Sequence, residues 1–184
     1  MKVEPWFHTI SGVKFDILNP TKDMIDINDI AHSLAMQCRW LGHCKYFFSV
    51  AEHAYHVSHL VPEQLALHGL LHDAAEAYVG DIITPYKALL GDVKKYEHKI
   101  LHLIFECFGV KNTLDDKQIV KYYDAQMIST EAYVLDPYAS DHEWIKNFPP
   151  PAKISLECWT PSTAKAIFLD RFYRITSVEG AKAA

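Results

Sequence analysis

The sequence predicts an all-α fold in which a single helical bundle follows a small N-terminal hairpin. From residue 26 onward, apolar residues recur three and four positions apart, which is the period of amphipathic helices. Capping residues, prolines and glycines divide this region into segments of helical length. The chain of 184 residues contains no internal repeat and no low-complexity tract. We therefore expect one domain, with residues 1–25 as hairpin and turn and residues 26–179 as the bundle.

The predicted hairpin lies at residues 7–17. Apolar and polar side chains alternate there on either side of Ser11 and Gly12, which indicates two short strands joined by a turn. Asn19 and Pro20 predict a second turn that leads into the first helix.

The first helix is expected to begin at a cap formed by Asp26 or Asn28. Its apolar face comprises Ile27, Ile30, Ala31, Leu34, Ala35 and Cys38. Residues 42–48 then form a loop. Ser49 and Glu52 match the capping box that opens a second helix, so Glu52 is interpreted as a purely structural residue.

A third helix is predicted from Pro62 to its stop at Gly80, and a short helical turn begins at Thr84 and Pro85. A long amphipathic helix follows over residues 92–108 and stops at the next glycine.

Two further helices complete the predicted bundle. Asp115 or Asp116 opens the first of them, and Thr160 with Pro161 opens the last. The prolines at 149–151 between these helices indicate a loop. On the last helix, Phe168, Phe172 and Tyr173 are expected to offer an apolar surface for self-association, which predicts a homo-oligomer.

Composition excludes several classes of protein. A formal net charge of −5 argues against binding of nucleic acid polymers, which need a basic face. The sequence has no uncharged apolar stretch long enough to predict a membrane span. Residues 1–6 lack the apolar core of a signal peptide. We therefore expect a cytoplasmic protein, either of a bacterium or, if phage-encoded, of the host cell. The four cysteines are scattered and are interpreted as buried thiols.

The doublet of His72 and Asp73 lies in a strongly apolar helical segment. An imidazole and a carboxylate are costly to desolvate, and a divalent metal ion compensates both directly. His53 and Asp124 are polar residues with apolar neighbours on two other predicted helices. Bundle cores are where helical proteins build metal sites, so we expect these four residues to bind one divalent ion. A set of two nitrogen and two carboxylate ligands suits Mn, Co, Ni, Fe or Zn.

Further candidates surround this doublet. Glu76 follows His72 by four residues and is expected on the same helical face, where a carboxylate orients water or transfers a proton to a leaving group. Arg39 suits phosphate recognition, and Trp40 suits a pocket wall. The histidines outside the four ligands, including His68, His98 and His102, are interpreted as structural or surface residues, so we expect one metal ion rather than two.

At these residues the chain resembles the HD-domain phosphohydrolases. His53, the doublet of His72 and Asp73, and Asp124 match the H…HD…D motif of that family in order. Residues 29–34, 39–43, 49–53, 72–78 and 80–87 resemble a small single-domain branch, which includes bacterial 5′-deoxynucleotidases, phage and prophage hydrolases and dATP triphosphohydrolases. The resemblance extends over roughly residues 7–130.

The resemblance implies an HD-domain helical bundle and the metal-dependent removal of 5′ phosphate from a nucleotide, either a dNMP or a dNTP such as dATP. It gives Asp73 a role at the metal and in catalysis, and Glu76 the role of catalytic carboxylate. It assigns substrate binding to Arg39, Trp40, Asp81, Thr84 and Lys87. Two alternatives stay open, a non-catalytic nucleotide sensor and an HD phosphodiesterase with a second metal ion.

Overall fold

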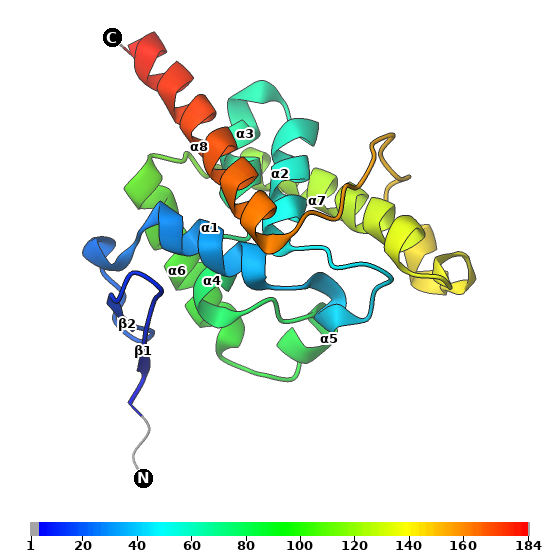
Figure 1. The fold of residues 1–184 in the computed structure, drawn as a ribbon, viewed down its shortest axis with the longest axis horizontal. Helices are drawn as coiled ribbons and strands as arrows, with labels where there is room; N and C mark the ends of the chain where they lie inside the picture. The colour runs from blue at the N-terminus through cyan, green and yellow to red at the C-terminus, as the bar shows by residue number, and fades with distance from the viewer. Residues whose placement is uncertain (1–3, 184) are drawn as a thin grey trace.

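The bundle is arranged around one helix, α2 (Val50–Leu60), which packs against α1, α3, α7 and α8. The computed structural model describes residues 4–183, with side chains up to residue 177. Figure 1 shows α8 crossing in front of α2, while α7 lies behind α2 and runs to the right of the view. Because α2 is covered on several sides, residues 50–54 are buried without interruption, including Glu52 and His53. A polar residue on this helix is therefore removed from water and needs a partner.

The remaining helices follow the chain in simple order. They are α1 (Ile27–Met36), α3 (Ala66–Leu71), α4 (Glu76–Val79), α5 (Thr84–Lys87), α6 (Val93–Phe108), α7 (Leu114–Leu135) and α8 (Pro161–Ala183). Short 3₁₀ turns occupy Lys22–Met24, Arg39–Gly42, Glu63–Leu65, Ala139–Asp141 and Glu143–Asn147. The prediction of an all-α bundle behind a hairpin is confirmed at this level, and no helix in residues 4–183 is both long and apolar enough to cross a membrane.

The N-terminal hairpin is formed by β1 (Trp6–His8) and β2 (Lys14–Asp16), as predicted. The strands pair antiparallel, with Phe7 opposite Phe15, and Gly12 in the turn has a φ of +87° that glycine adopts without strain. Phe15 is fully buried, and its ring stacks on that of Tyr78 at 4.1 Å between centroids. The hairpin is thereby fixed to α4, next to the turn that carries the predicted metal ligands.

The third predicted helix is broken where the sequence predicted it to be continuous. Helix α3 ends at Leu71, residues 72–75 form a tight turn, and α4 begins at Glu76. His72 Nδ1 donates to the carbonyl of Gly69 at 2.8 Å, and the backbone N–H groups of Ala74 and Glu76 bond three residues back instead of four. The His72 imidazole thus bonds a carbonyl group of its own helix, and the backbone winds more tightly at His72 and Asp73.

Two predicted caps also differ in detail. Helix α7 is capped by Thr113, which forms the full capping box with Asp116, so the expected start at Asp115 or Asp116 was slightly late. At α2, Ser49 accepts from the Glu52 N–H as expected, but the Glu52 carboxylate does not return to Ser49. It accepts instead from the three backbone N–H groups of residues 157–159, and so fastens the segment before α8 to α2.

The expected association surface on the last helix is wrong for two of its three residues. Phe168 and Phe172 are buried in the main core together with Ala164 and Ile175, and Tyr173 alone is half exposed. The periodic apolar face of α8 therefore packs on α1, α2 and α3 of its own chain. Self-association of the protein stays a prediction, but Phe168 and Phe172 do not provide a surface for it.

Gly69 sets the approach of α3 to α2. A Cβ atom there would lie 3.0 Å from Val61 Cγ2, 3.1 Å from Ser58 Cα and 3.2 Å from the Val57 carbonyl oxygen. Two of these atoms belong to the backbone of α2 and cannot move alone. We expect Gly69→Ala to lower the free energy of unfolding by about 1–2 kcal/mol in spite of the better helix propensity of alanine.

Denaturant unfolding measures this effect. Lys95→Ala, an exposed change on α6, is the control and should stay within about 0.5 kcal/mol of the parent protein. Equal or greater stability of Gly69→Ala would contradict the close packing of α2 and α3.

Candidate metal centre

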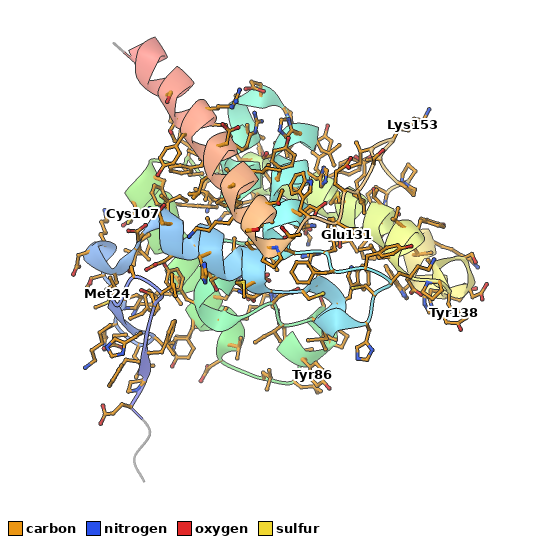
Figure 2. The ribbon with its side chains drawn as sticks, viewed as in Figure 1. Met24, Tyr86, Cys107, Glu131, Tyr138 and Lys153 are labelled. Carbon is orange, nitrogen blue, oxygen red and sulfur yellow. The ribbon has the colours of Figure 1, made fainter. Side chains whose placement is uncertain are left out.

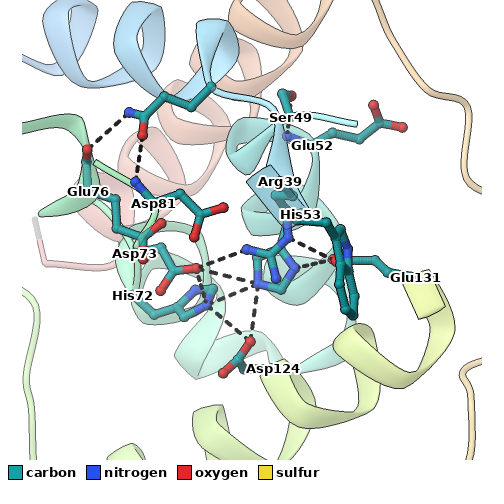
Figure 3. A network of polar contacts seen from close by, with 12 residues as sticks. Arg39, Ser49, Glu52, His53, His72, Asp73, Glu76, Asp81, Asp124 and Glu131 are labelled. Carbon is teal, nitrogen blue, oxygen red and sulfur yellow. Dashed lines mark hydrogen bonds and ion pairs between the residues drawn. The ribbon is translucent and has the colours of Figure 1, made fainter. Parts of the chain in front are cut away.

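The four predicted ligands converge from three parts of the bundle. His53 comes from α2, His72 and Asp73 come from the turn after α3, and Asp124 comes from α7. Figure 3 shows their side chains pointing toward one another. The Nε2 atoms of His53 and His72 are 3.3 Å apart. The sequence prediction of one shared centre agrees with this geometry.

The carboxylates complete the group on two sides. Asp124 Oδ1 lies 3.2 Å from His53 Nε2 and 3.8 Å from His72 Nε2. Asp73 Oδ2 lies 3.2 Å from His72 Nε2 and 3.6 Å from His53 Nε2. Two ligand atoms bonded to one ion at about 2.1 Å lie roughly 3.0–3.4 Å apart at tetrahedral or octahedral angles. The observed spacings are close to this range, and His53, His72 and Asp73 form a group that could hold a metal ion.

The other nitrogen of each imidazole already has an acceptor. His53 Nδ1 lies 2.5 Å from Glu131 Oε1, and His72 Nδ1 lies 2.8 Å from the Gly69 carbonyl oxygen. When each Nδ1 carries the proton, both Nε2 lone pairs face each other and the carboxylates. Such an arrangement lacks a positive charge at its middle, which a divalent cation supplies. The residues therefore fit a metal ion.

Electrostatics point in the same direction. Burial lowers the pKa of the His72 imidazole, but the Asp73 and Asp124 carboxylates raise it by more. The pKa therefore lies well above its ordinary value. Burial raises the pKa of Asp124, but hydrogen bonds from His53 and His72 hold it well below the usual range. Both pKa shifts have the same cause, because the carboxylates attract positive charge to the space between the four side chains.

Glu131 is the functional residue that sequence reasoning missed. Its side chain is fully buried, and Figure 2 places it in the middle of the bundle. Oε1 accepts from His53, while Oε2 accepts from Arg39 Nε at 2.9 Å and from Trp40 Nε1 at 3.0 Å. The available signal was its position seven residues after Asp124, which is two turns further along the same face of α7. A buried carboxylate on that face fixes the orientation of a ligand histidine.

Arg39 and Trp40 lie beyond the end of α1, in a 3₁₀ turn where Trp40 and Leu41 have positive φ. The Arg39 guanidinium is buried, bonds Glu131, and also lies 3.8 Å from Asp73 Oδ2. Trp40 is turned toward Glu131 and packs near Trp144, with 6.0 Å between ring centroids. Both side chains bond Glu131, and their roles as phosphate contact and pocket wall stay predictions.

Glu76 is buried beside the centre. Its Oε1 accepts from Lys87 Nζ at 3.1 Å, and its Oε2 has no hydrogen-bond partner among the described residues. Burial and the nearby Asp73 and Asp81 carboxylates raise the pKa of Glu76 to about 9. At neutral pH the group therefore holds a proton that it can donate.

The three remaining predicted substrate residues have different surroundings. Lys87 is already engaged, because it bonds Glu97 at 2.7 Å as well as Glu76. The backbone N–H of Asp81 donates to Gln37 at 2.8 Å, which leaves its half-buried carboxylate near Arg39. Thr84 is the exposed first residue of α5 and makes no side-chain hydrogen bond to another described residue.

Sequence comparison places the chain beside bacterial proteins. It is 39% identical to the uncharacterized protein YfdR of Escherichia coli over 165 residues, which cover 89% of this chain and 92% of YfdR. It is 44% identical to the uncharacterized protein RCAP_rcc00048 of Rhodobacter capsulatus over 95 residues, or 47% of this chain and 48% of that protein. No family model matches the chain.

The contact of Glu131 with His53 predicts a measurable effect on metal affinity. Glu131→Gln removes the negative charge and cannot accept from both His53 and Arg39 as the carboxylate does. We expect the affinity for Mn²⁺ to fall about 10- to 100-fold, as for other residues that orient a ligand histidine. Isothermal titration calorimetry of the purified protein with Mn²⁺ measures this change.

Glu52→Gln is the matched control, since Glu52 is an equally buried carboxylate next to His53 in the sequence, but it bonds residues 157–159 and lies 3.9 Å from His56 instead of contacting a predicted ligand. This control should lower stability and leave the affinity for Mn²⁺ within about twofold. An unchanged affinity in Glu131→Gln would show that Glu131 does not orient a metal ligand.

Proposed function

The chain belongs to the family of Escherichia coli YfdR, and we propose that it is a metal-dependent phosphohydrolase that removes 5′ phosphate from a deoxynucleotide. The observation that carries the proposal is the convergence of His53, His72, Asp73 and Asp124 with their Nε2 and carboxylate atoms about one point. The order of these residues resembles the HD-domain phosphohydrolases, and we propose that the helical bundle is an HD-domain fold.

A divalent ion in this centre would act as Lewis acid, hold the phosphate in place and lower the pKa of bound water. The chain's own residues set the other conditions of the reaction. Arg39 Nη1 lies 3.8 Å from Asp73 Oδ2 and so places a fixed positive charge beside that carboxylate. Burial raises the pKa of Asp73, but the charge and the hydrogen bond of His72 outweigh this effect and lower the pKa to about 2.

Glu76 is the proposed catalytic residue because it stores a proton near the centre. When the bond between phosphorus and the 5′ oxygen breaks, the departing alkoxide needs a proton, and a carboxylic acid held neutral by burial supplies it. Lys87 fixes the Glu76 side chain from one side, so its role is to position the acid. Asp81 is the proposed partner of the sugar hydroxyl, as its half-buried carboxylate faces the same region.

A single metal ion agrees with the arrangement of donors. Within residues 4–177, where side chains are described, only the group of His53, His72 and Asp73 brings three ligand atoms close enough for one ion. This supports a phosphomonoesterase type of reaction over a phosphodiesterase that uses a second ion.

The direct test is a nucleotide panel. The protein is incubated with Mn²⁺ or Co²⁺ and with deoxynucleoside mono- and triphosphates and ribonucleoside monophosphates. We expect release of nucleoside from at least one deoxynucleotide. Asp73→Asn should lower the rate by about 10³-fold or more because the metal centre is lost.

Glu76→Gln separates catalysis from binding. This variant should keep Mn²⁺ binding and lose about 10²- to 10⁴-fold in rate, as expected for removal of a general acid. Failure to release product from every nucleotide would end the proposal. Stoichiometric nucleotide binding in the presence of metal without turnover would support the non-catalytic sensor in its place.

A further inference from the structure

Two cysteines lie in direct contact at the turn that carries Arg39. The Sγ atoms of Cys38 and Cys44 are 3.7 Å apart, and both thiols are free. We refer to these two residues as the thiol pair. The four cysteines are half-buried, which corrects the sequence interpretation of buried thiols. Because both members of the thiol pair keep part of their surface in solvent, a small solute can approach them.

The backbone holds the two thiols together. Two backbone hydrogen bonds, of 2.9 and 3.2 Å, tie the residues on either side of Cys38 to residues 48–50. The chain then reverses through residues 40–42, all of which have positive φ. The residue after Cys44 donates from its backbone N–H to the last carbonyl of α7 at 2.9 Å. Both ends of the turn are thus fixed, and the contact between the thiols follows from the path of the chain.

A disulfide between these cysteines requires a small but definite movement. An S–S bond is about 2.05 Å long, so the two sulfurs need to approach each other by about 1.7 Å. The Cys44 thiol now donates to the carbonyl of Tyr46 at 3.0 Å, and a disulfide sulfur has no hydrogen with which to make this bond. Oxidation therefore changes the contacts of the turn as well as the distance between the sulfurs.

The thiol pair brackets the two residues that hold Glu131. Arg39 Nε and Trp40 Nε1 both donate to Glu131 Oε2, at 2.9 and 3.0 Å, while Oε1 accepts from the metal ligand His53. Two donors on one oxygen must point at the same place, so a shift of the turn weakens at least one of these bonds. The orientation of His53 depends on Glu131, and through it on the turn.

We propose that the thiol pair is a redox-sensitive site, which a hydroperoxide oxidises to an intramolecular disulfide, and that this bond lowers the metal affinity of the centre. The structure shows the reduced form, in which Arg39 and Trp40 both bond Glu131. The effect on the centre rests on the metal site of the proposed function, whereas the thiol chemistry does not depend on any nucleotide.

The oxidation takes two steps. The Cys38 sulfur attacks one oxygen of the hydroperoxide, the O–O bond breaks, and Cys38 becomes a sulfenic acid while water or an alcohol leaves. The Cys44 sulfur then attacks the Cys38 sulfur, the S–O bond breaks, and the hydroxyl group leaves with the proton of Cys44 as water. The two thiols lose two electrons, which reduce the hydroperoxide. Burial and the hydrogen bond with Cys38 raise the pKa of Cys44 to about 11, so Cys44 keeps its proton until the second step.

The first test identifies the bond. The reduced protein is treated with hydrogen peroxide in EDTA, its free thiols are alkylated, and it is digested with trypsin without reduction. Trypsin cleaves after Arg39 and Lys45, so the two cysteines fall in different peptides, residues 23–39 and 40–45. We expect mass spectrometry to find these peptides joined, two hydrogens lighter than their sum, and separated again by dithiothreitol.

Cys107→Ser is the matched control, because Cys107 is another half-buried thiol but lies on α6, where it contacts the carbonyl of Lys22. This variant should form the joined peptides as the parent does. A bridge from Cys38 or Cys44 to Cys158, or oxidation of the thiol pair to sulfinic and sulfonic acids without a bridge, would overturn the inference.

The second test measures the metal centre. After removal of peroxide and EDTA, isothermal titration calorimetry with Mn²⁺ compares the reduced and the bridged parent protein. We expect the affinity of the bridged form to be lower by about tenfold, at the lower end of the range for residues that orient a ligand histidine, and dithiothreitol to restore it. An equal affinity of the two forms would contradict the coupling of the thiol pair to Glu131.

Cys44→Ser separates the bridge from other effects of peroxide. Its hydroxyl group can still donate to the Tyr46 carbonyl, so the reduced variant should bind Mn²⁺ within about twofold of the parent. Peroxide should leave that affinity unchanged, and an equal loss in this variant would assign the effect to another residue. A bridge without Mn²⁺ binding in either form would reject the metal centre and keep the redox site. Mn²⁺ binding without any bridge would do the reverse.

Discussion

The buried contact between His53 and Glu131 is the constraint on which the arrangement of the centre depends. It joins α2 to α7 through two side chains that are fully removed from water. Glu131 is ionised there because Arg39 and His53 offset the cost of its burial and hold its pKa below the usual value. A buried charge of this kind is tolerated only with its partners in place, so the turn that carries Arg39 and the axis of α2 are fixed relative to α7.

Charge counting connects this contact to the metal. The carboxylates of Asp73, Asp124 and Glu131 carry three negative charges, and the Arg39 guanidinium carries one positive charge. With neutral imidazoles, the contacting groups are left with two negative charges, which is the charge that one divalent cation balances. The doublet of His72 and Asp73 completes the centre because the chain tightens at residues 72–75 and turns both side chains to the same point.

Sequence reasoning recovered what periodicity and residue type encode. The order of the helices, the hairpin and the convergence of His53 with Asp124 all follow from apolar spacing and isolated polar residues in apolar surroundings. The break after Leu71 was missed because it depends on a side chain, His72, that bonds the carbonyl of its own helix. Glu131 was missed because nothing local distinguishes a buried glutamate from an exposed one on a helix whose apolar pattern is weak.

The functional neighbours were harder to place than the ligands. Arg39 and Lys87 suggested phosphate contacts by residue type, yet both are neutralised by carboxylates that lie far away in sequence or on another helix. Conversely, nothing in the sequence singles out Lys117 and Lys121, and the packing of α3, α6 and α7 puts them in one cavity lining with Asp124. Pairing of charges is a tertiary property, so residue type alone did not separate a free cation from a bound one.

Anomalous diffraction from crystals grown with Mn²⁺ tests the central claim most directly. The account predicts one strong peak bonded by the Nε2 atoms of His53 and His72 and by carboxylate oxygens of Asp73 and Asp124, at about 2.0–2.3 Å. A peak at any other place in the molecule, or a centre in which His53 stays bonded to Glu131 but reaches no metal ion, would contradict it.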